Sequence, residues 1–257
     1  MNSVESGKVA RRRRLWRVIL LLVACAGLAA FHPWILERVA RGLVAPKRIR
    51  NEPISYLVLP ANHLPTAELY DEISRQMKEF GGESRLLVVE GARQRIEQLG
   101  AVPTGAEIAY RESLKRNLPA EKIEILRTDA VDGWEEIRAI RHRLEGEAPS
   151  GIRILVGEFG SKEYAMILRR QWSESLFQRT EIWPVHDPRY DVTNWWKSRR
   201  GWKSFFGNCV SLFAAVALGE PARKWKQVPA EQYEKLVEAT LFGAGQISAT
   251  AVAEQNR

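Results

Sequence analysis

Short apolar runs alternate with amphipathic segments through the middle of the chain. Near-continuous apolar runs predict strands covered on both faces, and segments with an apolar residue every three or four positions predict helices. The expected strands cover residues 54–59, 86–89, 123–126, 152–156 and 181–185. The expected helices between them cover residues 66–80, 104–117, 132–144 and 161–172.

This strand–helix repeat predicts the fold class. A β–α repeat of about 30 residues implies right-handed crossovers and a mostly parallel sheet. We therefore expect an α/β fold: a Rossmann-like, three-layer domain with about five mostly parallel strands over residues 54–219. The runs at 123–126 and 181–185 are expected toward the edges of the sheet.

The end of the chain departs from the repeat. Residues 192–206 interleave five aromatic residues with four basic ones, a pattern typical of contact with sugars, lipid headgroups or a membrane surface, or of packing against the sheet edge. We favour packing. Residues 205–218 predict an apolar helix of about 14 residues, too short to cross a bilayer. Residues 220–257 are expected to form an amphipathic helix over 229–243 and a flexible tail.

The N-terminal part of the chain carries a long apolar run. Residues 18–36 contain no Asp, Glu, Lys or Arg, and as a helix they would extend about 28 Å, close to the thickness of a bilayer core. We predict a basic cytoplasmic segment over residues 1–14, a transmembrane helix over 15–36 and a linker over 37–53. The inner (plasma) membrane is thus an expected partner.

The basic residues that flank this run predict its orientation. Four consecutive arginines, Arg11 to Arg14, lie next to the run, whereas three of the five bases after it lie more than ten residues away. The positive-inside rule then places the N-terminus in the cytoplasm and the domain in the periplasm or outside the cell. Alternatives are a cleaved signal peptide, lipidation at Cys25 and a weak twin-arginine signal; a retained single span is preferred.

Charge and cysteine content exclude several classes of function. The formal net charge is +8, but residues 1–50 hold eleven of the 39 bases and only two of the 31 acids. The rest of the chain is close to neutral, so we expect no nucleic-acid partner. The two cysteines, Cys25 and Cys209, exclude a disulfide scaffold and a cysteine-based zinc site.

Polar residues follow three of the predicted strands. Asn62 and His63 come after the first strand, Glu90 ends the second and Glu158 follows the fourth. Carboxyl ends of parallel strands meet at one edge, where open α/β sheets bind ligands. We expect a ligand site there, with His63 and Glu158 as candidate base and acid, or with Glu90, Glu158 and His63 binding a divalent cation. The alternative is that Glu90 and Glu158 cap helices and form ion pairs with nearby bases.

Standard phosphate-binding and hydrolase motifs do not occur. The chain lacks Gly-x-Gly-x-x-Gly, the Gly-x-x-x-x-Gly-Lys-Ser/Thr loop and the Gly-x-Ser-x-Gly nucleophile elbow. No cofactor is therefore assigned, and no metal ligand set is predicted.

The order of segments, together with the pieces ISYLVLP, LLVVEGA, TGAEIAYRESLKRNLPAEKIEIL, ILVGEFGSKEYAMILRR and NWWKSRRGW, resembles the YdcF/SanA/ElyC-like family of bacterial envelope proteins. The similarity covers about residues 52–219. The resemblance implies a ligand site at the strand ends that includes Asn62, His63, Glu90, Glu107, Glu135, Glu158 and Ser161. The family's histidine and arginine after the fourth strand are replaced here by other residues.

From the resemblance we expect a single-pass membrane-anchored protein of the cell envelope that assists cell-wall or surface-polysaccharide biogenesis. It would bind a small or lipid-linked anionic ligand at the strand ends and would contact other envelope-biogenesis proteins. Two alternatives remain open: a non-catalytic interaction module, and a hydrolase or transferase that acts on a phosphorylated or lipid-linked substrate.

Overall fold

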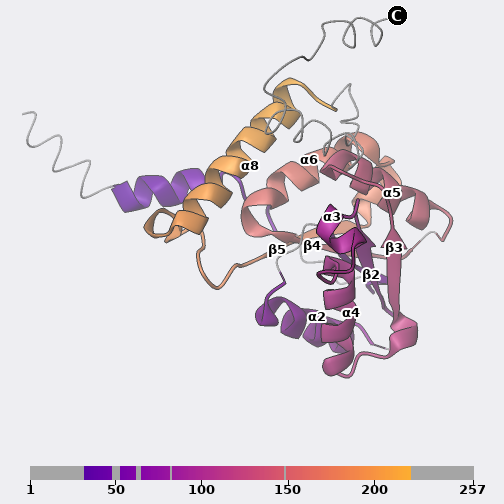
Figure 1. The fold of residues 1–257 in the computed structure, drawn as a ribbon. Coiled ribbons are helices and arrows are strands. Elements are labelled where there is room, and N and C mark those ends of the chain that lie inside the picture. The colour runs from indigo at the N-terminus through magenta and orange to yellow at the C-terminus, as the bar shows by residue number, and fades with distance from the viewer. Residues whose placement is uncertain (1–31, 48–52, 62–64, 82, 148, 221–257) are drawn as a thin grey trace, which may run out of the picture.

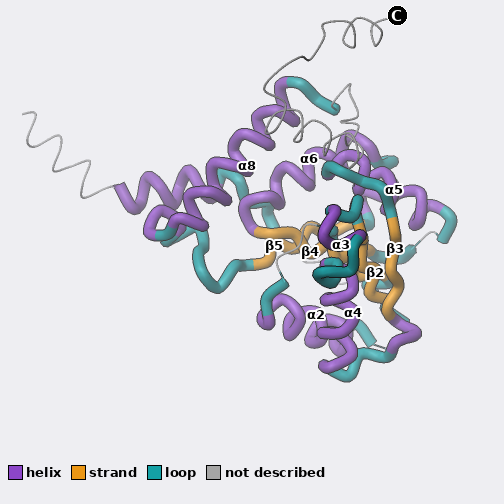
Figure 2. Tube along the Cα trace, viewed as in Figure 1, coloured by secondary structure: helices purple, strands orange, loops and turns teal. Residues whose placement is uncertain are grey.

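A computed structural model describes residues 32–47, 53–61, 65–81, 83–147 and 149–220 of the 257 residues (Figures 1 and 2). Five strands form one parallel sheet, in the order β3-β2-β1-β4-β5. The strands are β1 Tyr56–Leu59, β2 Arg85–Glu90, β3 Ile123–Arg127, β4 Ile152–Gly157 and β5 Thr180–Val185. The predicted α/β fold with five parallel strands is confirmed, and both strands expected near the edges lie there.

Helices cover both faces of the sheet, as the ribbon shows (Figure 1). Alternate residues of each strand face opposite sides, so Val58 and Leu87 belong to one core and Leu57 and Leu86 to the other. The first core packs against α5 (Gly133–Glu145) and α6 (Ser161–Gln171), and the second against α2 (Ala67–Glu79) and α4 (Gly105–Lys115). The domain therefore has three layers, with the sheet between two layers of helices.

The helix starts follow the capping residues in the sequence. Thr66, Thr104 and Asp132 precede α2, α4 and α5, and each side chain accepts a hydrogen bond from a backbone N–H of the first turn. The short helices α3 (Arg95–Gln98) and α7 (Glu174–Gln178) were not predicted. Elements of four or five residues are too short to show a helical period.

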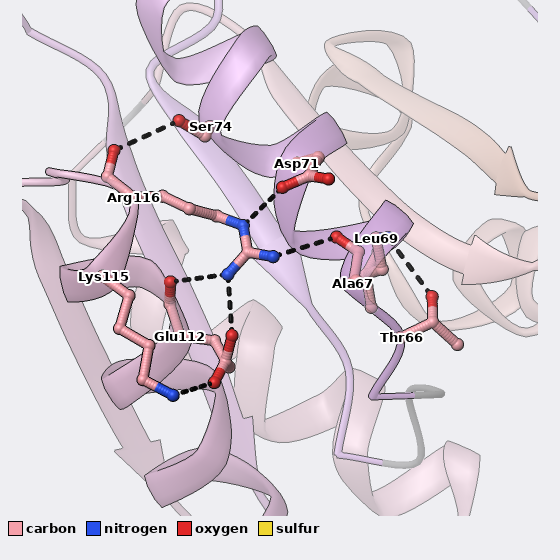
Figure 3. A network of polar contacts seen from close by, with 8 residues as sticks. All are labelled: Thr66, Ala67, Leu69, Asp71, Ser74, Glu112, Lys115 and Arg116. Carbon is pink, nitrogen blue, oxygen red and sulfur yellow. Dashed lines mark hydrogen bonds and ion pairs between the residues drawn. The ribbon is translucent and has the colours of Figure 1, made fainter.

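Arg116 links α2 and α4 on the outer side of their layer (Figure 3). Its guanidinium donates hydrogen bonds to Asp71 Oδ1 at 2.6 Å, to Glu112 Oε2 at 2.7 Å and to the Ala67 carbonyl at 3.3 Å. The carbonyl at the N-terminal end of α2 and two carboxylates are thus held by one side chain. This contact stabilises the helix pair at the far side of the sheet from α6.

Helix α8 (Arg199–Ala217) begins six residues before the expected start. Ser198 caps it by accepting a hydrogen bond from Gly201 N at 2.9 Å. Glycine is required at position 201, because an added Cβ would lie 2.2 Å from the Trp195 carbonyl oxygen. Trp195 is fully buried and stacks on Phe205 with ring centroids 3.8 Å apart, so this residue packs inside the protein, but against α8 and residues 40–43 and not against the sheet edge.

Part of the expected linker, residues 37–53, packs against the domain. Residues 32–41 are helical, and Ala40 and Leu43 join a third core cluster with Trp195 and Phe205. Ala45 N donates to Ser161 Oγ at 2.8 Å, which attaches the segment to the start of α6.

Most of the expected transmembrane segment, residues 15–31, and the C-terminal part, residues 221–257, lie outside the described residues. Within the described ranges, no helix is both long enough and apolar enough to cross a membrane.

Candidate functional site at the carboxyl ends of the strands

The sheet order places a topological switch point between β1 and β4, because the chain runs from β1 toward β3 on one side and from β4 toward β5 on the other. Open α/β sheets bind ligands outside the strand carboxyl ends at such a point. Two cavities of about 270 and 410 Å³ lie at this edge, and both are lined by Glu136. Glu136 therefore stands at the centre of the candidate site.

The larger cavity is bounded by the ends of β1, β4 and β5 and by residues of α5, α6 and α8. Its polar lining includes the side chains of Glu136, Glu158, Glu163, Tyr164 and Asp187. Four of them are acids, and none of the described residues that line this cavity is a lysine, an arginine or a histidine. The cavity thus has a negative lining.

Glu136 is a buried carboxylate in the first turns of α5, only 4 % exposed. Its Oε1 accepts a hydrogen bond from Ala61 N at 2.6 Å, just beyond the end of β1. Burial is the largest cause that raises the pKa of Glu136, the Ala61 hydrogen bond lowers it and the charge of Asp132 raises it, and together they bring the pKa to about 7. Glu136 is therefore a side chain that exchanges a proton near neutral pH.

Tyr164 in α6 carries a buried hydroxyl that no other described residue hydrogen-bonds. Burial raises the pKa of Tyr164 well above its usual value, and the nearby charge of Glu136 raises it further. Buried polar groups in native proteins are nearly always paired, so an unpaired hydroxyl beside a cavity requires an explanation. A bound ligand or water would supply the missing partner.

Two further carboxylates of the cavity have raised pKa values. Burial raises the pKa of Glu158, which follows β4, although the charge of His186 opposes the shift. Burial also raises the pKa of Glu163 in α6, against a hydrogen bond that Ser211 Oγ donates at 2.6 Å. Three carboxyl groups around one cavity thus hold protons more tightly than they would in water.

Asp187 behaves differently. Burial acts to raise its pKa, but the hydrogen bonds from Arg189, the shortest at 2.7 Å, outweigh burial and lower it. Asp187 is therefore an ionised residue that already has a cationic partner. Its charge stabilises the loop after β5.

The smaller cavity contains Glu90, but this carboxylate is already paired. Arg93 Nε donates to Glu90 Oε1 at 2.6 Å, and Arg127 Nε lies 3.5 Å from Oε2. Only 7 % of Glu90 is exposed. Glu90 thus forms an ion pair with a nearby base, as the alternative interpretation of the sequence expected. Glu90 and Glu158 line different cavities.

The other predicted site residues have local structural contacts. Glu107 lies in the first turn of α4 and lines neither cavity. Glu135 accepts a hydrogen bond from Val131 N at 3.2 Å, which closes the loop before its own helix. Ser161 Oγ donates to the Glu158 carbonyl at 2.7 Å and accepts from Ala45 N. Asn62 and His63 lie outside the described residues.

Sequence reasoning selected Glu135 and passed over its neighbour Glu136. A signal for Glu136 was present, because it lies four residues before Ile140 and so shares the apolar face of α5. Tyr164 and Glu163 carried no such signal, since aromatic and acidic residues are ordinary on an amphipathic helix. Among the described residues, no three His, Cys, Asp or Glu side chains are grouped closely enough to hold a metal ion.

No family model, no curated protein and no solved structure matches this chain. The resemblance to the YdcF/SanA/ElyC-like family therefore stays a prediction, and the site rests on the geometry described above.

Proposed function

We propose that this protein is a single-pass membrane-anchored α/β protein of the cell envelope that binds a small ligand in the cavity beside Glu136. The observation that carries the ligand site is the buried Tyr164 hydroxyl, which no other described residue hydrogen-bonds; Tyr164 lines a cavity at the switch point together with Glu136, whose pKa is about 7. A role in cell-wall or surface-polysaccharide biogenesis is supported by the family resemblance alone.

The lining determines the ligand class. The acids of the lining accept hydrogen bonds, and although Asp187 is paired with Arg189, no lysine, arginine or histidine lines the described part of the cavity to bind an anion, contrary to the ligand that the sequence suggested. Phe159, Tyr190 and Ile167 add apolar walls. We propose that a neutral or cationic, hydroxyl-bearing group such as a sugar or an amino sugar fills the cavity; any phosphate of a lipid-linked ligand would lie outside it.

Catalysis is a second candidate function, and one observation favours it. A general acid or base works best when its pKa lies near the working pH, and Glu136 meets this condition inside a cavity. A hydrolase or transferase that uses Glu136 to move a proton would replace the pair of His63 and Glu158 expected from the sequence.

Two substitutions test the proposed site. Tyr164→Phe removes the unpaired hydroxyl, and Glu158→Gln removes one carboxylate charge; both should lower the thermal shift produced by monosaccharides and amino sugars. We expect Tyr164→Phe alone to leave the unliganded protein as stable as the original or more stable by about 1 kcal/mol, because a buried unpaired hydroxyl is lost.

The matched control is Tyr110→Phe, which removes a hydroxyl from a half-buried position on α4 that lines neither cavity. It should leave the thermal shifts unchanged. Equal shifts in the original protein, Tyr164→Phe and Glu158→Gln would contradict the proposed site. Turnover of a glycoside by the original protein but not by Glu136→Gln would favour the enzyme.

A further inference from the structure

Helix α8 presents an exposed apolar face. Trp202, Phe206, Val210 and Phe213 follow one another at spacings of four, four and three residues, so they lie on one side of the helix. Their exposed fractions are 42, 50, 68 and 73 %. The buried residues Gly201, Phe205 and Ala215 lie on a different side, which packs against the domain. Trp202 and Phe206 touch the buried ring of Trp195 with one edge, but among the described residues this second apolar face stays largely uncovered.

The helical residues 32–41 lie beside α8, as Figure 1 shows, and pack against the same cluster. Trp195, which precedes α8 and stacks on Phe205 of that helix, donates a hydrogen bond from Nε1 to the Leu36 carbonyl at 3.4 Å, so it contacts both segments. This short helix also exposes large apolar side chains, Trp34, Ile35 and Val39. Large apolar residues are therefore exposed on two neighbouring elements at one end of the molecule.

The charged side chains of α8 are all basic. Helix α8 contains no acidic residue, and Arg199, Arg200 and Lys203 are exposed in its first turns. Exposed aromatic and aliphatic residues combined with basic ones are typical of a helix that lies in the headgroup region of an anionic membrane. A protein partner with an apolar surface would not by itself explain the three bases.

We propose that the apolar face of α8 lies in the surface of a bilayer that contains anionic lipids, with Arg199, Arg200 and Lys203 against the headgroups. The proposal rests on the membrane anchor of the proposed function, because the apolar run at residues 18–31 leads directly into the helical residues 32–41. An anchor that enters the bilayer there brings the end of the domain that carries α8 to the membrane surface.

The test uses the full chain in vesicles, in a Cys25→Ala/Cys209→Ala background. A fluorophore is attached at Phe213→Cys, and a control fluorophore at Glu79→Cys at the end of α2, on the opposite side of the sheet. The vesicles contain phosphatidylcholine and phosphatidylglycerol with brominated acyl chains. We expect the bromine to quench the probe at position 213 and not the probe at position 79, and iodide in the water to do the reverse.

Two outcomes overturn the proposal. Quenching of the probe at 213 by iodide would show that the face stays in water. Protection of that probe from both quenchers would show that protein covers the face, either residues 229–243 of the same chain or a second copy.

A charge variant gives an independent measurement. Arg199→Glu, Arg200→Glu and Lys203→Glu together should abolish bromine quenching at position 213, and so should removal of phosphatidylglycerol. The control variant Lys78→Glu on α2 should leave bromine quenching at position 213 unchanged. Quenching that survives the triple charge reversal would contradict the role of the bases.

The anchor and the docking face fail in different ways. If the protein resists extraction by alkaline carbonate while the probe at position 213 stays unquenched, the anchor is supported and the docking of α8 is contradicted. If carbonate removes the protein from vesicles in which bromine had quenched that probe, the anchor is contradicted and the docking of α8 is supported.

Discussion

At the scale of single residues, Glu136 is a nearly fully buried carboxyl group with a strongly raised pKa. Its carboxylate is buried next to Ala61 N and near the charge of Asp132, and its pKa is raised from 4.5 to about 7. The folded protein therefore binds a proton at Glu136 more tightly than the unfolded chain does. The stabilisation from this proton is fully present below about pH 4.5 and is lost as the pH rises through 7.

Glu136→Gln removes this dependence, because glutamine keeps an acceptor for Ala61 N and carries no charge. We expect the variant to be more stable than the original protein at pH 8, by roughly 3 kcal/mol at most, and to lose this advantage below pH 4.5. Urea denaturation at several pH values measures the difference. A constant difference between the two proteins across the range would contradict the raised pKa.

At the scale of elements, the hydrophobic pattern predicted all five strands to within two residues of their observed ends. Caps and apolar periods located α2, α4, α5 and α6 equally well, because these helices are long enough to show a period. The start of α8 was missed by six residues, because its first six residues are mostly basic and aromatic, whereas its end was predicted to within one residue.

The site was predicted only in outline, at the carboxyl ends of the strands. Glu158 follows a strand directly, so its position could be predicted from the sequence. Glu163 and Tyr164 reach the same cavity from within α6, and their burial depends on α8, which packs against α6 from far along the chain. Contacts between distant segments of this kind leave no local pattern in the sequence.

A buried ion pair joins the two strands at one edge of the sheet. Arg153 Nη2 in β4 lies 2.6 Å from Glu181 Oε2 in β5, and Arg153 also contacts Gln76 Oε1 at 3.3 Å. The guanidinium lies over the rings of Phe80 and Trp183. This pair takes the place of apolar side chains on the face that α2 covers.

Glu181→Ala should lower the free energy of unfolding by about 3 to 5 kcal/mol, because it leaves a buried arginine without its carboxylate. The double variant Arg153→Met/Glu181→Leu removes both charges and should lose much less. Urea denaturation of the two variants at pH 7 separates these cases. If the double variant lost as much stability as Glu181→Ala, the unpaired charge would not be the cause.

At the scale of the whole molecule, we expect the domain to lie outside the cytoplasm. A cysteine introduced at Glu79 in the Cys25→Ala/Cys209→Ala background should react with a membrane-impermeant reagent in intact cells, after the outer membrane, if there is one, is made permeable. The arginines before the apolar run give the physical reason. Protection until the inner membrane is broken would place the domain in the cytosol and favour nucleotide-like ligands.

The attachment of the N-terminal segment to α6 has a mechanical consequence. Ala45 N donates a hydrogen bond to Ser161 Oγ, and Lys162 N donates one to the Leu43 carbonyl at 3.1 Å. Both hydrogen bonds involve the first turn of α6, the helix that carries Glu163 and Tyr164. A pulling force that reached residues 43–45 would be borne by these two hydrogen bonds before it reached β1. Tension from the N-terminal side would thus be transmitted to the wall of the cavity. Such a load would displace α6, the helix that lines the cavity.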